Sequence, residues 1–357
     1  MESNHDSNPI VSLSNVSIGY GSSKRVASNL NATLSRGSLT CLLGANGTGK
    51  STLIRTICAL QPMLEGSIEL DGVEVSHLTA QQLSKRLSIV LTDRLDVANA
   101  TVEELVSYGR SPYTGFLGRL SDHDKKMVDY SLKCCQIGHK RKELLANLSD
   151  GERQKAVIAK AMAQDTPLIV LDEPTAFLDL PTRVEIMQLL RELATSFNKA
   201  ILMSTHDMEL ALQMSDKLWI MQKGGELQAG SPEDLQLSGA FEQLFHQTNV
   251  KLDIRTGLFK VSYNFNHTLP TVGHGFHFVL LRRAFARKGI KLDHSQPTEG
   301  IWLKIENLDR TRYLIYFDDT LISAHQQVDE AVTMVDYYLK SPSLKHLIDG
   351  SPKQKTT

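Results

Sequence analysis

The chain has 357 residues, more than one ordinary hydrophobic core accommodates, which predicts two domains. Its 39 lysines and arginines balance 40 aspartates and glutamates, so a formal net charge of −1 gives no general attraction to nucleic acid or anionic lipid. No segment approaches the ~20 consecutive apolar residues that span a bilayer, so any membrane role is expected to be peripheral.

Residues 1–9 are polar and lack the apolar core of a secretory signal, so we expect the protein to stay in the cytosol. The four cysteines fit that compartment, because none has metal-ligand spacing and a cytosolic thiol is usually reduced.

The first predicted strand covers residues 10–20, where apolar and polar residues alternate over most of the length. It ends at Tyr20, and a tyrosine there either stacks on an adenine base or packs on the core. Residues 31–34 and 66–70 indicate further strands of an antiparallel sheet.

Residues 44–52 have the sequence GANGTGKST, which fits the phosphate-loop pattern G-x-x-x-x-G-K-[ST]. An apolar run at 38–43 predicts a buried strand before this loop, and helical spacing over 53–60 predicts a helix after it. Such a turn directs backbone N–H groups and a helix dipole at polyphosphate oxygens, with Lys50 reaching the terminal phosphates and Ser51 a Mg²⁺ ion. The candidate nucleotide-binding residues here are Gly44, Asn46, Gly47, Gly49, Lys50, Ser51 and Thr52.

Residues 88–91 predict another strand, which runs into Thr92. Helical patterns then dominate residues 101–136, so an inserted helical subdomain is expected over about residues 93–160. Within it, Ser149 and Gly151 begin a helix. They either form a second phosphate contact at the positive helix end, or Ser149 is simply an N-cap.

Residues 168–171 form an uninterrupted apolar run that ends in Asp172 and Glu173, as expected of a buried parallel strand whose end lies in a ligand site. Asp172 is then a Mg²⁺ ligand, and Glu173 accepts a proton from an attacking water. The next apolar run, 200–203, leads to His206, which either contacts the γ-phosphate or is structural.

In their order and spacing these motifs resemble the nucleotide-binding subunit of ABC transporters, over residues 10 to about 245. The resemblance implies an α/β P-loop NTPase cassette with a mixed sheet core, an antiparallel β subdomain and the inserted helical subdomain. It also implies roles: Tyr20 is the adenine-stacking residue, residues 44–52 are the Walker A loop, and residues 148–152 are the signature. Asp172 and Glu173 are the Walker B aspartate and catalytic glutamate, Asp179 is the D-loop aspartate and His206 the switch histidine.

The same resemblance implies a mechanism in which two copies pair head to tail. Ser149 and Gly151 of one copy close over the ATP that Lys50 and Ser51 of the other hold, and hydrolysis drives transmembrane permease subunits. Mg²⁺ is the implied cofactor, no nucleic acid is expected as a partner, and the location is the cytoplasmic face of the inner membrane.

Two positions depart from the family pattern. Thr92 stands where the family has the Q-loop glutamine, and its hydroxyl is the candidate metal ligand there, with Asp93 taking over part of the role. Asp150 replaces a signature glycine, which predicts weaker affinity in the closed pair, because a carboxylate near phosphate is unfavourable.

Residues 109–112 and 177–180 look like those of importers for ferric siderophores, haem and cobalamin, which also use a periplasmic binding protein. The alternative is a soluble or exporter-type ABC ATPase that is not coupled to metal-chelate uptake. The transported substrate cannot be read from this chain.

Residues 251–357 extend beyond the cassette, which is expected over residues 1–250. A helix is predicted over 276–288, strands near 301–305 and 313–317, and a final helix over 328–339. These predict a small α+β domain, regulatory or dimer-stabilising, with a disordered tail from about residue 351. His274 and His277 either belong to a metal sensor or are incidental.

Overall fold

The computed structural model describes residues 9–21, 24–91, 99–115, 118–222, 224–245, 250–253, 258–295, 299–306 and 311–340. Contacts divide the chain into two compact units: unit 1 has residues 1–248 and 252–259, and unit 2 has residues 249–251 and 260–357. Within the described ranges, no helix is long and apolar enough to cross a membrane.

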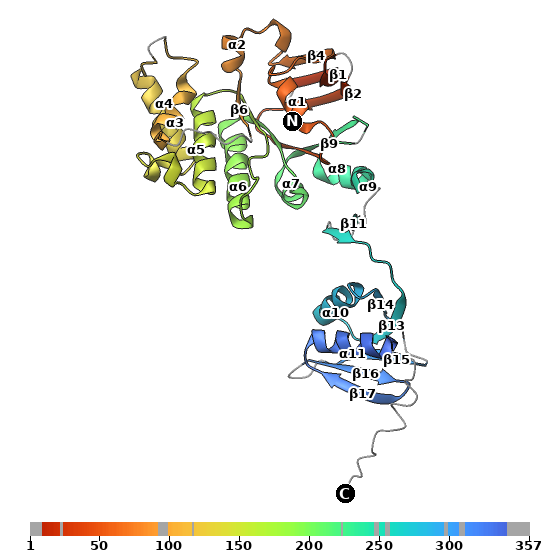
Figure 1. Cartoon of the computed structure of the whole chain (residues 1–357). Helices are drawn as coiled ribbons and strands as arrows, with labels where there is room; N and C mark the ends of the chain where they lie inside the picture. The colour runs from red at the N-terminus through yellow and green to blue at the C-terminus, as the bar shows by residue number, and fades with distance from the viewer. Residues whose placement is uncertain are drawn as a thin grey trace, which may run out of the picture. The chain divides into compact units, whose positions relative to one another are not determined.

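A six-stranded sheet in the order β10-β9-β3-β8-β7-β6 forms the centre of unit 1 (Figure 1). Its strands are β3 (Leu39–Gly44), β6 (Leu87–Val90), β7 (Leu168–Leu171), β8 (Ala200–Ser204), β9 (Lys217–Met221) and β10 (Leu227–Gly230). Strands β6, β7, β8, β3 and β9 run parallel, whereas β10 pairs antiparallel with β9. Every residue of β3, β7 and β8 is buried, because both faces of a parallel sheet are covered.

A second sheet of unit 1 is antiparallel, in the order β2-β1-β4-β5. Its strands are β1 (Val11–Tyr20), β2 (Lys24–Leu34), β4 (Glu65–Leu70) and β5 (Val73–Glu74). Helix α1 (Lys50–Ile57) shares one hydrophobic core with this sheet, and the short α2 (Ala80–Ser84) precedes β6. The strand predicted at 31–34 is therefore only the end of the longer β2.

The inserted helical subdomain contains α3 (Val102–Ser107), α4 (Asp122–Cys134) and α5 (Asp150–Ala163). Each begins with a capping box, from Thr101, Ser121 and Ser149 respectively, as the spacing of Ser or Thr before Glu or Asp allows. Both α3 and α4 pack against α5. Gly109, in the 3₁₀ turn after α3, lets that turn approach α5 closely, because a Cβ there would lie 2.2 Å from the carbonyl oxygen of Lys160.

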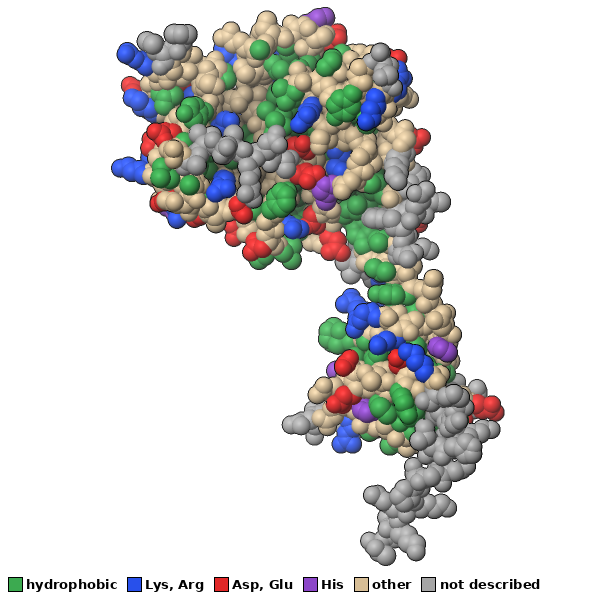
Figure 2. All heavy atoms as spheres, in the orientation of Figure 1, with side chains coloured by type: hydrophobic (Ala, Val, Ile, Leu, Met, Phe, Trp, Pro, Cys, Tyr) green, Lys and Arg blue, Asp and Glu red, His purple; other side chains and the backbone are tan. Residues whose placement is uncertain are grey.

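Four more helices complete the described part of unit 1: α6 (Leu180–Phe197), α7 (Met208–Met214), α8 (Pro232–Leu237) and α9 (Ala240–Phe245). Short 3₁₀ turns lie at Val75–His77, Tyr108–Arg110, Gly138–Lys140 and Leu145–Asn147. Figure 2 shows acidic and basic side chains interspersed on the visible face of this unit, in keeping with the small net charge.

Strands β11 (Val250–Asp253) and β12 (Leu258–Val261) pair where the chain passes from unit 1 to unit 2. Unit 2 is built on a five-stranded sheet in the order β14-β13-β15-β16-β17. Its elements are β13 (His267–Val272), α10 (Phe276–Ala286), β14 (Ile290–Asp293), β15 (Ile301–Glu306), β16 (Arg312–Phe317), β17 (Thr320–His325) and α11 (Val328–Lys340). Both helices contribute to one core with the sheet. Strands β13, β14 and β17 were not predicted from the sequence.

In unit 2 the side chain of His277 bonds Tyr313 through Nδ1 and Thr311 through Nε2. The described residues contain no group of three or more metal-ligating side chains, and the metal-sensor interpretation gains no support. The predicted tail from residue 351 lies outside the described residues.

Candidate nucleotide-hydrolysis site

Polar side chains gather where three neighbouring parallel strands end. Strand β3 leads into the loop of residues 44–52, β7 leads into Asp172 and Glu173, and β8 ends at Ser204 two residues before His206. Because β8 pairs with both β3 and β7, all three strand ends lie at one edge of the sheet. Ligands of α/β proteins bind at such an edge.

The loop after β3 depends on two glycines with left-handed backbones. Gly47 has a φ of 79°, and Gly49, directly before α1, has a φ of 107°. A side chain at Gly49 would also bring its Cβ within 2.6 Å of Val26. The loop can therefore bring its backbone N–H groups close together only with glycine at these positions.

Lys50 is the buried cation of the site. Its ammonium donates to the carbonyl oxygens of Gly44, at 2.8 Å, and of Ala45, at 3.3 Å. Burial lowers the pKa of the Lys50 ammonium, and the nearby carboxylates of Glu173 and Asp172 oppose that shift. The ammonium thus binds the carbonyls of its own loop, and the oxygens of a bound polyphosphate are suited to replace them.

Two carboxylates face this cation from the end of β7. Asp172 Oδ1 accepts a hydrogen bond of 2.6 Å from the Ser204 hydroxyl and lies 3.4 Å from Ser51 Oγ. Glu173 has a φ of 51°, and its Oε1 lies 2.5 Å from His206 Nε2. The structure therefore brings together Ser51, Asp172, Glu173 and His206.

Tyr20 lies at the end of β1, beside the start of α1, with half of its side chain exposed. Its hydroxyl is 3.1 Å from Thr52 Oγ1, so it is anchored next to the phosphate loop. An exposed ring held in this way suits stacking on a base better than packing in the core.

The signature residues begin α5. The Ser149 hydroxyl caps the helix by accepting from the Glu152 N–H at 3.2 Å, and the Glu152 carboxylate accepts from the Ser149 N–H at 2.9 Å. A Cβ on Gly151 would lie 2.5 Å from Thr182 Cγ2. Within the described residues, no hydrogen bond links Ser149 or Gly151 to the phosphate loop of the same chain.

Asp179 is the N-cap of α6, and Thr182 in the first turn of that helix leaves no room for a Cβ on Gly151. Its carboxylate accepts from the Thr182 N–H at 3.2 Å, and the bonds from Thr182 hold the pKa of Asp179 below its usual range. Asp150 has its side chain largely exposed, with Oδ1 3.8 Å from Arg153. Its carboxylate is thus on the protein surface.

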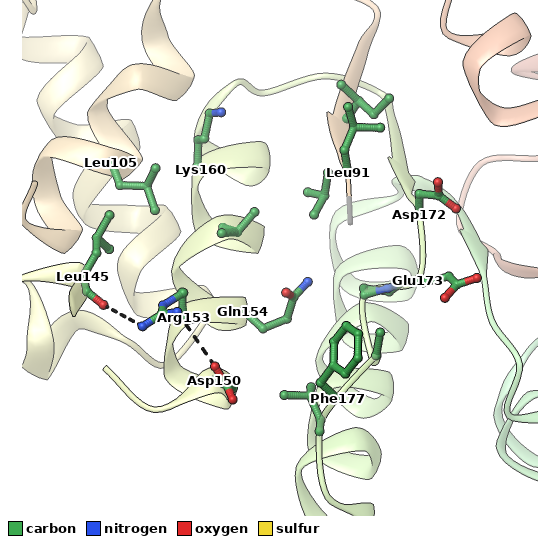
Figure 3. A pocket seen from close by; sticks show the side chains of 16 residues that line it. Leu91, Leu105, Leu145, Asp150, Arg153, Gln154, Lys160, Asp172, Glu173 and Phe177 are labelled. Atoms are coloured by element: carbon green, nitrogen blue, oxygen red, sulfur yellow. Dashed lines mark hydrogen bonds and ion pairs between the residues drawn. The ribbon is translucent and has the colours of Figure 1, made fainter. Parts of the chain in front are cut away.

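A cavity of about 400 Å³ separates α5 from the loop that follows β7. Figure 3 shows Gln154 of α5 and Phe177 of the loop on opposite walls, with Glu173 at one side. Leu91 also lines this cavity, whereas Thr92 and Asp93 lie outside the described residues, so their predicted role stays a prediction.

Sequence reasoning did not single out Ser204, although it bonds both Asp172 and Glu173. The available signal was a serine that ends an apolar strand two residues before the candidate switch histidine. The sequence indicates Arg110 only as part of a subgroup motif. In the structure its buried guanidinium bonds Asp124 and the Ala163 carbonyl oxygen within the helical subdomain.

The fold and this site together define an ATP-binding cassette that hydrolyses ATP. A family model described as "ABC transporter" matches residues 27–176. An uncharacterized ABC transporter ATP-binding protein of Methanocaldococcus jannaschii is 36% identical over 250 residues, which are 70% of this chain and 86% of that protein. The iron(3+)-hydroxamate import ATP-binding protein of Bacillus subtilis is 32% identical over 247 residues, which are 69% of this chain and 91% of that protein.

Two solved structures are similar to a large part of this chain. A metal-chelate type ABC transporter in an inward-facing conformation matches with a TM-score of 0.60 and 25% identity, over 71% of this chain and 96% of that one. A dimeric bacterial ABC transporter cassette matches with a TM-score of 0.54 and 26% identity, over 62% and 98%. The chain belongs to the ABC transporter ATP-binding proteins, and the predicted cassette fold and ATPase class are confirmed.

Proposed function

We propose that this chain is the ATP-hydrolysing subunit of an importer for iron chelates, and that it works as a head-to-tail pair beneath transmembrane permease subunits. The observation that carries the proposal is the meeting of Lys50, Asp172, Glu173 and His206 at one sheet edge, next to the phosphate loop. The names of relatives support the direction and the cargo, because the matches include import ATP-binding proteins for petrobactin and for iron(3+)-hydroxamate, and a ferric enterobactin transport ATP-binding protein.

Mg²⁺ fits the residues present. Ser51 Oγ and Asp172 Oδ1 are oxygen donors 3.4 Å apart, and Mg²⁺ prefers oxygen ligands and keeps several waters. Ser51 and Asp172 would hold the ion, directly or through water, with Thr92 as a further candidate ligand. When bound, Mg²⁺ neutralises charge on the phosphates of ATP.

Different side chains of the chain have different proposed roles in hydrolysis. Lys50 exchanges its loop carbonyls for phosphate oxygens, and Tyr20 stacks on the adenine. Glu173 Oε accepts a proton from the attacking water, and His206, at 2.5 Å from Glu173 Oε1, orients that carboxylate and the terminal phosphate.

One chain supplies only part of the site. Ser149 caps α5 and Gly151 lies in its first turn, at the positive end of the helix. In the described structure, no hydrogen bond links either residue to the phosphate loop of its own chain. We infer that they close over ATP bound by a second copy, with Asp179 beside them. The similarity to a dimeric cassette supports this pairing.

The decisive experiment expresses the chain with its candidate permease and tests three properties together. We expect copurification, Mg²⁺-dependent ATP hydrolysis, and uptake of a labelled ferric siderophore into vesicles that depends on a binding protein outside the membrane. Hydrolysis with outward movement of the substrate would favour an exporter. Hydrolysis without any permease partner would favour a soluble ATPase.

A further inference from the structure

Ser204 is a buried polar residue at the site to which the proposed mechanism gives no role. It is the last residue of β8 and is fully buried between β3 and β7. Its hydroxyl contacts both members of the carboxylate pair, at 2.6 Å from Asp172 Oδ1 and 2.8 Å from the Glu173 backbone nitrogen.

The direction of both hydrogen bonds is fixed by chemistry. A backbone N–H can only donate, so the Ser204 oxygen accepts from Glu173. The single hydroxyl proton is then donated to the Asp172 carboxylate, a charge-assisted bond of the stronger kind. One atom therefore fixes the metal-binding carboxylate and the backbone of the candidate base at once.

The Glu173 backbone needs such a contact, because its φ of 51° lies in the left-handed region that disfavours side chains. The end of β8 holds Glu173 twice: Ser204 accepts from its N–H, and His206 contacts its carboxylate. Removing the hydroxyl frees the peptide between Asp172 and Glu173 and leaves that partly buried N–H without its acceptor.

We propose that Ser204 is a positioning residue that sets Asp172 toward Ser51 for Mg²⁺ and holds Glu173 in its strained conformation. This inference rests on the proposed ATP and Mg²⁺ site. It assigns to β8 a part in metal affinity, in addition to the phosphate contact expected of His206.

The test compares Ser204→Ala with Ser88→Ala in the full chain assembled with its permease. Ser88 is the matched control, because it is also buried in the same sheet and its hydroxyl bonds Thr166 at 3.1 Å, away from the carboxyl edge. The measurements are the ATP dissociation constant with Mg²⁺, the same constant in EDTA, kcat, and thermal stability.

For Ser204→Ala we expect unchanged ATP affinity in EDTA, a several-fold smaller gain in affinity when Mg²⁺ is added, and a kcat lower by about tenfold. Ser88→Ala should lose comparable stability and keep both the Mg²⁺ gain and kcat. Ser204→Thr, which retains a hydroxyl, should recover the Mg²⁺ gain. If Ser204→Ala does not fold, Ser204→Cys replaces it, because a thiol keeps the volume and donates only weakly.

A Ser204→Ala protein with the wild-type Mg²⁺ gain and kcat would overturn the inference, as would an equal loss in Ser88→Ala. These outcomes are distinct from failure of the proposed function, in which the wild-type assembly itself would show no Mg²⁺-dependent hydrolysis.

Discussion

Two groups of charged side chains in the described part of unit 1 differ in how their charges are balanced. In the helical subdomain, Arg110 and Asp124 are both almost fully buried and form a bond of 2.8 Å. Arg110 also donates to the Ala163 carbonyl oxygen at 2.7 Å, and Asp124 accepts from the Ser121 hydroxyl and N–H. Each group that bonds Arg110 or Asp124 here is therefore part of the folded chain itself.

At the sheet edge, by contrast, the charges are held by partners that a ligand can replace or join. The Lys50 ammonium binds carbonyls of its own loop, Asp172 accepts from a serine, and Glu173 contacts a half-exposed histidine. A fully compensated buried pair stabilises one arrangement of helices, whereas the sheet-edge site is proposed to bind a polyphosphate and a cation. We therefore expect substitutions in the helical subdomain pair to lower stability, and substitutions at the sheet edge to lower turnover.

The largest effect should come from Glu173→Gln. The amide keeps the size of the side chain but cannot accept the proton of the attacking water, so we expect kcat to fall by roughly 10²-fold or more with ATP still bound. Steady-state hydrolysis and nucleotide binding by the assembled transporter measure the two quantities. Unaltered turnover would show that Glu173 is not the proton acceptor, and the sheet-edge group would then not differ from the Arg110–Asp124 pair in this respect.

Arg110→Met should lower the free energy of unfolding, which tests whether the buried pair is structural. The substitution leaves the Asp124 carboxylate buried without its cation, which costs about 3–5 kcal/mol in the free energy of unfolding. The control is Lys125→Ala, because Lys125 and Asp122 form an exposed pair at 3.1 Å whose loss costs about 0.5 kcal/mol. Urea unfolding separates the two, and similar midpoints for both variants would contradict a structural role for Arg110.

The two groups also differ in what the sequence could predict. The sheet-edge residues belong to motifs of fixed spacing, so the sequence alone predicts roles for Lys50, Asp172 and Glu173. Arg110 and Asp124 are 14 residues apart on different elements, and no local pattern indicates that the fold joins them. Ser204 was missed for a similar reason, because its contacts with Asp172 and Glu173 arise from strand order in the sheet. The pairing of Tyr20 with Thr52 likewise depends on how the antiparallel sheet packs beside α1.

Ser149→Ala tests whether Ser149 acts only as the N-cap of α5 or also contacts a ligand. Loss of the N-cap should cost about 1 kcal/mol of stability, and loss of a contact to the partner's ATP should lower kcat about tenfold. Ser231→Ala is the matched control, because Ser231 caps α8 through the Asp234 N–H at 3.1 Å and lies outside the proposed site. Equal stability losses with unchanged kcat in both variants would leave Ser149 as a cap alone.

The smallest effect is a pH dependence carried by Asp124. Burial by itself would raise the pKa of Asp124, but the bonds from Ser121 and Arg110 outweigh burial and lower it to about 2. In the unfolded chain the pKa is about 3.9, so this stabilisation is complete above about pH 5 and is lost as the pH falls toward 2. Wild-type protein should therefore lose about 1 kcal/mol more than Asp124→Asn between pH 5 and pH 3 in urea unfolding. Parallel losses in the two proteins would show that the Asp124 carboxylate is not held as tightly as its three hydrogen bonds indicate.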